Sequence, residues 1–189
     1  GWTEMGQGIH TVARQILCEA LGLGDCELID IKVTTASAAV GGVTTASRGT
    51  MLLGRSIIDA ALKLKKDLES HSLKELAGRM YEGRFVCDYT QAEGRPGKIV
   101  SHIAYGFATH LAILDEKGGL DTIYAAHDSG RVINPLLFEG QIEGGVVMGL
   151  GYALSEKVPL AEGRLTSEKY ISIGIPKLAK LPRIMPISV

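Results

Sequence analysis

The sequence predicts an α+β fold: a two-layer lobe with a small mixed sheet, a β-hairpin and three main helices. Three stretches place apolar residues at helical spacing, and two neighbouring stretches alternate apolar and polar residues around a glycine-containing turn. No linker rich in Pro, Gly and Ser divides the chain. We therefore expect residues 1–189 to form one lobe, with a less regular tail at 156–189.

The first expected helix spans residues 9–21. Its apolar residues recur at helical spacing, and Gly22 and Gly24 follow at the point where the helix should stop. Alternating apolar residues then predict a strand over 28–35. A second helix is expected over 47–69, since apolar residues form a stripe along one side of it and lysines cover the other.

A hairpin is expected over residues 99–127. The charged segment before it leaves room for a short helix at 73–82. The strands of the hairpin, 99–114 and 120–127, flank the sequence D-E-K-G-G, which suits a five-residue turn.

The third expected helix spans 135–154 and carries both start signals. Asn134 can cap the helix, and Pro135 suits its first position. Four of the six prolines follow in the tail, where we expect irregular structure with one or two strands.

Composition excludes several classes of protein. Twenty Lys and Arg against 21 Asp and Glu give a net charge of −1, which argues against a general nucleic-acid or anionic-membrane binder. No signal peptide is evident, and no apolar run reaches the roughly 20 residues that a membrane span needs. Three widely spaced cysteines without a C-x-x-C pair favour a reducing, cytoplasmic location. Because the chain starts at Gly1 and not at Met, we expect it to be processed or cut from a larger protein.

Glycine is in excess, with 24 among 189 residues against the usual ~7%, so its clusters need a local explanation. Gly6-Gln7-Gly8 runs into the first helix, and the T-T-A-S-R sequence at 44–48 runs into the second. A loop that feeds a helix start leaves N–H groups free to bind an anion such as phosphate. Ordinary helix capping is the alternative for each loop taken alone. Glu4 is a candidate for ordering the first loop.

The second glycine cluster lies on the third helix. Gly140 and Gly144 are four residues apart, as are Gly145 and Gly149, so each pair shares one helix face. Such a smooth face admits a flat ligand or another backbone. Tight helix–sheet packing is the simpler alternative.

Taken together, four segments resemble the molybdenum-binding subunit of the xanthine dehydrogenase and aldehyde oxidase family, the molybdenum hydroxylases. They are T-E-M-G-Q-G-I-H-T at 3–11, T-T-A-S-R at 44–48, A-A-H-D-S-G-R-V-I-N-P at 125–135 and E-G-Q-I-E-G-G-V-V-M-G-L-G at 139–151. Their order and spacing also match, and the resemblance covers nearly the whole chain. Within the family, the chain is most similar to the bacterial selenium-dependent xanthine or purine hydroxylases.

The resemblance implies a molybdenum–molybdopterin cofactor, in bacteria usually the cytosine dinucleotide form. Family members hydroxylate a purine, another N-heterocycle or an aldehyde with oxygen from water. Their electrons leave through Fe–S clusters and often FAD, carried on other domains or subunits. The expected partners are therefore the rest of the molybdenum subunit, the iron–sulfur and flavin subunits and a small substrate, without nucleic acid or membrane.

Ten residues are implied in cofactor binding. The first loop would contact the pterin or its phosphate, the second loop would hold the pyrophosphate, and Gln141 would bond the pterin while glycines let it approach. They are Gly6, Gln7, Gly8, Thr45, Ala46, Ser47, Arg48, Gly140, Gln141 and Gly144.

The sequence departs from the family at its catalytic base, a glutamate in a G-x-G-E motif that is absent here. We expect this glutamate beyond Val189, so that the chain is one partial cofactor-binding lobe, cut at both ends and inactive alone. Glu143 is interpreted as structural, and His127-Asp128 as closing a turn. No histidine shows metal-ligand spacing, so no metal ligand is expected from this chain. The rival hypotheses are a non-catalytic cofactor-handling or scaffold module, and a generic nucleotide-binding domain.

Overall fold

The computed structural model describes residues 1–34, 36, 39, 41–91, 94, 96–100, 104–167 and 169–189. Backbone contacts divide the chain into an N-terminal unit, residues 1–103, and a C-terminal unit, residues 104–189. The first unit is helical and the second holds a sheet with a helix, which confirms the predicted α+β class. The single lobe expected over 1–189 stays a prediction.

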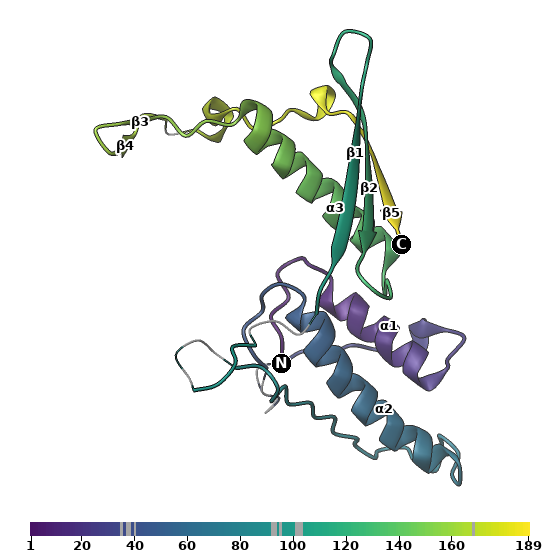
Figure 1. Cartoon of the computed structure of the whole chain (residues 1–189). Coiled ribbons are helices and arrows are strands. Elements are labelled where there is room, and N and C mark those ends of the chain that lie inside the picture. Colours follow the sequence, from purple (N-terminus) through teal and green to yellow (C-terminus); the bar gives the residue numbers. More distant parts are fainter. Residues whose placement is uncertain are drawn as a thin grey trace. The chain divides into compact units, whose positions relative to one another are not determined.

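The N-terminal unit is built on two packed helices (Figure 1). Helix α1 spans Ile9–Leu21, as predicted, and buries Ile9, Val12 and Ala13. The second expected helix consists of a π-helical turn, η2, at Gly49–Leu53, followed by α2 at Gly54–Leu68. Both segments begin with a glycine, because a Cβ at Gly49 or Gly54 would lie only 3.1 or 2.9 Å from an isoleucine of α1. The two glycines therefore let the helices approach closely.

Helix α1 ends in a left-handed turn, where Gly22 takes a φ of 70° and its N–H donates to the carbonyls of Cys18 and Glu19. The chain then reverses through a short 3₁₀ turn, η1, at Cys26–Leu28. This reversal brings the Cα atoms of Cys18 and Cys26 within 5.4 Å, and the two residues form a disulfide. The expectation of reduced cysteines is therefore wrong for this pair, while Cys87 is a free thiol.

Two local predictions in the N-terminal unit are wrong. The strand expected at 28–35 is absent over described residues 28–34, where the chain finds no strand with which to pair. The short helix expected at 73–82 is replaced by turns over 72–78 and then by extended chain. The first part of this segment keeps short-range backbone bonds, such as Leu76 N–H to the Ser72 carbonyl, whereas Arg79, Tyr81 and Glu82 bond to α2.

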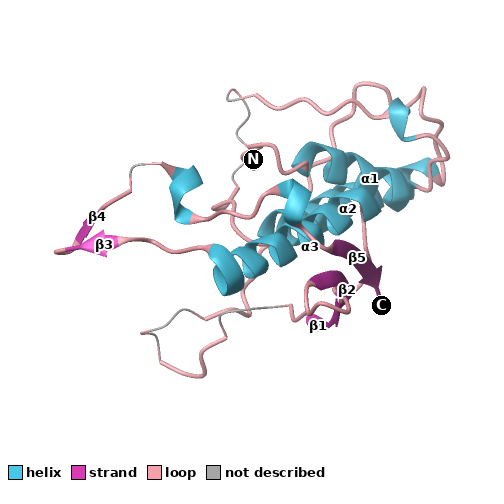
Figure 2. Cartoon of the chain, turned by 90° about the horizontal axis from the view of Figure 1, so that it is seen from above, coloured by secondary structure: helices cyan, strands magenta, loops and turns pink. Residues whose placement is uncertain are grey.

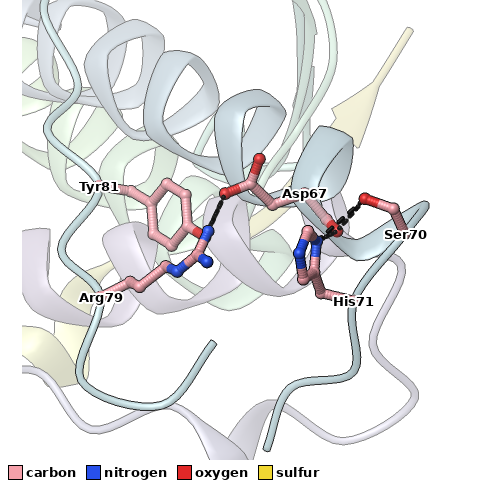
Figure 3. Close-up of polar contacts among 5 residues, drawn as sticks. All are labelled: Asp67, Ser70, His71, Arg79 and Tyr81. Carbon is pink, nitrogen blue, oxygen red and sulfur yellow. Dashed lines mark hydrogen bonds and ion pairs between the residues drawn. The ribbon is translucent and has the colours of Figure 1, made fainter. Parts of the chain in front are cut away.

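An extended strap, residues 79–85, lies along α2 and is held by four helix residues spaced four apart. Because residues at i and i+4 share one helix face, all four can contact the same segment. The contacts are Arg55 beneath the Phe85 ring, Asp59 with the Arg84 N–H, Lys63 with the Glu82 carbonyl, and Asp67 with Arg79 and Tyr81. Figure 3 shows the last of these contacts, at the end of α2.

The C-terminal unit contains the predicted hairpin. Strand β1, Phe107–Leu114, pairs antiparallel with β2, Leu120–Asp128, and Asp115 organises the turn between them by accepting the N–H groups of Lys117 and Gly119. The first strand is shorter than the expected 99–114. Residues 104–106 are irregular, and 101–103 lie outside the described residues.

Helix α3, Pro135–Leu150, covers one face of this sheet (Figure 2). The Asn134 side chain accepts the Leu137 N–H at 3.0 Å, so both predicted start signals are confirmed. The expected helix 135–154 ends as a second π-helical turn, η3, at Gly151–Ser155. The core between helix and sheet is small and apolar. It comprises Ile123, Ala125, Ile142 and Val146, flanked by Leu120, Phe138, Leu150 and Ile184.

The tail contributes a strand to the sheet, which confirms both the strand expected in the tail and the mixed sheet. Strand β5, Arg183–Ser188, pairs parallel with β2, giving the order β1-β2-β5 and a mixed sheet. Pro186 is tolerated because β5 is an edge strand, where a missing N–H costs no ladder bond on the open side. The rest of the tail forms a small hairpin, β3 at Leu160–Ala161 with β4 at Arg164–Leu165, and two 3₁₀ turns, η4 at Tyr170–Ile173 and η5 at Leu178–Lys180.

Within the described part of the chain, the helices are too short or too polar to span a membrane.

Candidate functional site

The glycine–glutamine loop is organised by its own carboxylate. Glu4 accepts the N–H groups of Gly6 at 2.7 Å, Gly8 at 3.2 Å and His10 at 3.4 Å, at the start of α1. Partial burial would raise the pKa of Glu4, but these N–H groups and the nearby His10 outweigh it, so the pKa lies below its usual range. Glu4 therefore orders the loop, as interpreted from the sequence, and the phosphate site expected at these N–H groups stays a prediction.

Gln7 also bonds within its own loop. Its Oε1 accepts the Met5 N–H at 2.7 Å, and its Nε2 donates to the Thr3 carbonyl at 2.7 Å. The amide thus donates and accepts at once, toward backbone groups of its own loop. A ligand that bonded the Gln7 side chain would have to share it with these partners or replace them.

The second loop offers free polar groups. Ala46 takes a φ of 46°, a left-handed turn that orients the chain into η2, and Thr45 and Ser47 are exposed. Their hydroxyls have no hydrogen-bond partner among the described residues. Arg48 is tied to its own loop, because its Nη1 donates to the Val43 carbonyl at 3.3 Å.

The two loops lie together. The Thr3 N–H donates to the Thr44 hydroxyl at 3.3 Å, and Gly49 packs against Ile9. Beside them, the Nε2 atom of His10 is buried without a hydrogen-bond partner in the described residues. A buried polar atom in this state indicates a missing partner, such as a water or a ligand atom. Nothing in the sequence pattern singled out His10.

The glycine-rich face of α3 is open. A Cβ added at any of its four clustered glycines would meet nothing within 4 Å; they are Gly140, Gly144, Gly145 and Gly149. Tight helix–sheet packing therefore does not explain them, since Ile142 and Val146 make the packing face. Gln141 is exposed, and its amide has no partner among the described residues.

The ten predicted site residues thus form two groups. Those in the two loops belong to the N-terminal unit and lie close together, whereas Gly140, Gln141 and Gly144 belong to the C-terminal unit. Taken unit by unit, the free hydroxyls of the second loop have the chemistry to bind a phosphate, and the open amide of Gln141 has the chemistry to bond a heterocycle. In the first loop, Glu4 already accepts the N–H groups that a cofactor phosphate would need.

Of two other residues interpreted from the sequence, Asp128 behaves as expected, and the structural role of Glu143 stays a prediction. Asp128 accepts the Gly130 N–H at 3.1 Å and so closes the turn after β2. Glu143 is exposed on α3. In the described residues, no group of three or more His, Cys, Asp or Glu side chains could hold a metal ion.

Comparison with known proteins identifies relatives that match almost the whole chain. The putative xanthine dehydrogenase molybdenum-binding subunit XdhA of Escherichia coli (strain K12) is 26% identical over 97% of this chain and 29% of its own length. The xanthine dehydrogenase of Emericella nidulans is 28% identical over 100% of this chain and 15% of its own length. The chain thus spans less than a third of these curated relatives.

Solved structures share the fold. Quinoline 2-oxidoreductase from Pseudomonas putida 86 matches all of this chain and 29% of its own, with a TM-score of 0.72 and 22% identity. The reconstituted CO dehydrogenase from Oligotropha carboxidovorans matches all of this chain and 28% of its own, with a TM-score of 0.73 and 22% identity.

A family model described as a molybdopterin cofactor-binding domain matches residues 1–182, which include all four motifs, the N-terminal unit and the C-terminal unit up to β5. The chain belongs to this family of molybdopterin cofactor-binding domains, and the resemblance to the molybdenum hydroxylases is confirmed.

Proposed function

We propose that this chain binds the molybdenum–molybdopterin cofactor of an oxidoreductase similar to xanthine dehydrogenase. The observation that carries the proposal is the face of α3, where the free amide of Gln141 stands among glycines with open space above them. A flat heterocycle can approach such a face and take a hydrogen bond from the amide.

The second loop, in the other unit, offers groups suited to a different part of the cofactor. The hydroxyls of Thr45 and Ser47, at the start of the second helix, suit the pyrophosphate of the cofactor's dinucleotide. Arg48 adds a positive charge beside them. Gly6, Gln7 and Gly8 form the third group, with Glu4 holding their backbone in place.

When bound, the cofactor would supply the redox chemistry by which a carbon of a purine, N-heterocycle or aldehyde gains oxygen from water. The chain's own residues position the cofactor and exclude none of these substrates. We further propose the cytosine dinucleotide form, Fe–S and FAD partners on other domains or subunits, and a cytoplasmic location. Because no G-x-G-E motif is present, the 189-residue chain alone should not turn over substrate.

The test uses the native assembly, purified through a tag on this chain, with molybdenum measured by mass spectrometry and the released nucleotide by chromatography. Gln141→Ala should lower molybdenum content per chain, and Gly144→Val should lower it further because a branched side chain fills the open face. Glu139→Ala, an exposed change on the same helix, serves as the matched control.

Unchanged molybdenum loading in both Gln141→Ala and Gly144→Val would reject the α3 assignment. Loss of loading in Glu139→Ala to the same degree would show a general effect on the helix. Molybdenum-dependent hydroxylation by the purified 189-residue chain would contradict its inactivity when alone.

A further inference from the structure

Two histidines meet on the hairpin of the C-terminal unit, outside the proposed cofactor residues. His110 lies on β1 and His127 on β2, and the strand register pairs each with an alanine: His110 with Ala125, and Ala108 with His127. Directly opposed residues of an antiparallel pair share a face of the sheet, so both imidazoles stand on one face, diagonally across the strands. The small alanines leave room for the two rings to turn toward each other.

The two rings point nitrogen to nitrogen. Their Nε2 atoms lie 2.9 Å apart, the ring centroids are 5.0 Å apart, and the planes are inclined at 47°. One Nε2 must donate and the other accept in this contact, so at least one ring offers a lone pair. His110 is exposed and His127 half-buried, which leaves the pair accessible from solvent.

We propose that His110 and His127 form a two-histidine site for a divalent metal ion that takes ligands at right angles, Ni²⁺ or Cu²⁺. Neutral imidazole is a common ligand for these ions. When the donor ring carries its proton on Nδ1 instead, both Nε2 atoms have lone pairs, and a rotation of each ring turns them toward one point beside the contact. With metal–nitrogen bonds of about 2.0–2.1 Å, nitrogens 2.9 Å apart subtend about 90° at the metal. Tetrahedral Zn²⁺ would require the nitrogens to move to about 3.3 Å apart.

Water completes the coordination, because the described residues contain no larger group of ligating side chains. The site is therefore exchangeable, unlike the closed sites that use four protein ligands. A bound ion would clamp β1 to β2. The inference depends only on the hairpin and is independent of the proposed function.

The experiment titrates Ni²⁺ and Cu²⁺ separately into the tag-free 189-residue chain and follows binding by calorimetry. We expect one ion per chain at the tightest site. His110→Asn and His127→Asn should each weaken it about tenfold or more, a loss of at least about 1.4 kcal/mol. His71→Asn, which changes an exposed histidine of the N-terminal unit, should leave it unchanged. Affinities of the two asparagine variants equal to that of the unaltered chain would overturn the proposal.

A second measurement does not depend on whether the variants fold. In the unaltered chain, imidazole NMR signals should broaden with substoichiometric Cu²⁺ first at His110 and His127. Broadening that begins at any other histidine, or at none, would overturn the site.

Discussion

The Tyr81 hydroxyl donates a hydrogen bond to the Asp67 carboxylate over 2.8 Å and fixes the strap to the end of α2 (Figure 3). The same carboxylate oxygen accepts Arg79 Nη1 at 3.2 Å. Beside it, the His71 ring contacts the Ser70 hydroxyl at 2.9 Å and the Asp67 carbonyl at 3.2 Å. One residue at a helix end thus orders both the turn after α2 and the chain that returns along it.

Removing the Tyr81 hydroxyl should weaken the attachment of the strap to α2. In Tyr81→Phe, Asp67 loses its shortest partner, so the melting temperature should fall, and amide exchange along residues 79–85 should accelerate. Met80→Leu, an exposed change in the same strap, is the control. Unchanged exchange rates in Tyr81→Phe would contradict a holding role for the bond.

The contact also predicts two linked titrations. The Tyr81 bond, with Arg79 and His71 assisting against partial burial, holds the pKa of Asp67 below its ordinary 3.8. Its stabilising effect is therefore complete above that value and is lost as the pH falls through the lowered pKa. Burial and Asp67 raise the pKa of Tyr81 above its ordinary 10.0, so its contribution is complete below 10.0 and is lost as the pH rises from 10.0 through the raised value. Ultraviolet titration of Tyr81 should move toward 10.0 in Asp67→Asn.

Glu4 should make the first loop sensitive to acid. Its lowered pKa means that the folded loop is stabilised at pH values above the ordinary 4.5 and loses this stabilisation as the pH falls through the lowered value. Glu4→Gln should accelerate amide exchange at Gly6, Gly8 and His10 at neutral pH, and should remove the acid dependence. The check is hydrogen exchange by NMR, with Glu19→Gln as a comparison at the other end of α1. A pH-independent loop in the unaltered chain would refute the carboxylate's role.

The left-handed turn at the end of α1 should require glycine at position 22. Gly22→Ala should cost about 1–2 kcal/mol of unfolding free energy, because Gly22 has a φ of 70°. Gly24→Ala provides the matched control, since Gly24 has open space around it and no left-handed φ, and should change stability by less than about 1 kcal/mol. Denaturant titration of both variants decides the matter. Equal effects would contradict a requirement for glycine at Gly22.

The core under α3 should be sensitive to cavities. Ile142 is 7% exposed, so Ile142→Ala should cost about 2–5 kcal/mol. Leu136 is 78% exposed on the same helix, and Leu136→Ala should stay within about 0.5 kcal/mol of the unaltered chain. Near-ultraviolet circular dichroism during denaturation measures both. A neutral Ile142→Ala would show that the helix does not depend on this face.

Most of the fold was predictable from the sequence where local signals were strong. The apolar stripe and the stop at Gly22 gave α1 its limits, and Asn134-Pro135 located the start of α3. The π-helical turns were not predictable, because apolar spacing does not distinguish a π-helical turn from an α-helical one and tertiary packing decides between them. The strand expected at 28–35 failed for a similar reason, since apolar alternation forms a strand only where another strand is available.

The sequence predicted which residues make up the candidate site better than it predicted their hydrogen bonds. The motifs located the loops and the helix face, and Glu4 was a candidate for ordering the first loop. The Gln7 side chain bonds the backbone of Met5 and of Thr3. These bonds depend on the geometry of the loop, which residue spacing does not predict. The meeting of His110 with His127 depends on strand register, and the disulfide depends on the reversal after α1.

The parallel pairing of β5 with β2 also sets an order of events during synthesis. Ile123 pairs with Ile184 near the far end of the chain, whereas β1 and β2 are joined by a short turn. Contacts so distant in sequence form late, because the intervening chain must first be closed into a loop. On the ribosome, the β1–β2 hairpin and α3 can therefore assemble while β2 still exposes an unpaired edge. Until β5 emerges, the free edge of β2 can pair with strands of other chains. Chaperones protect nascent sheets from such pairing.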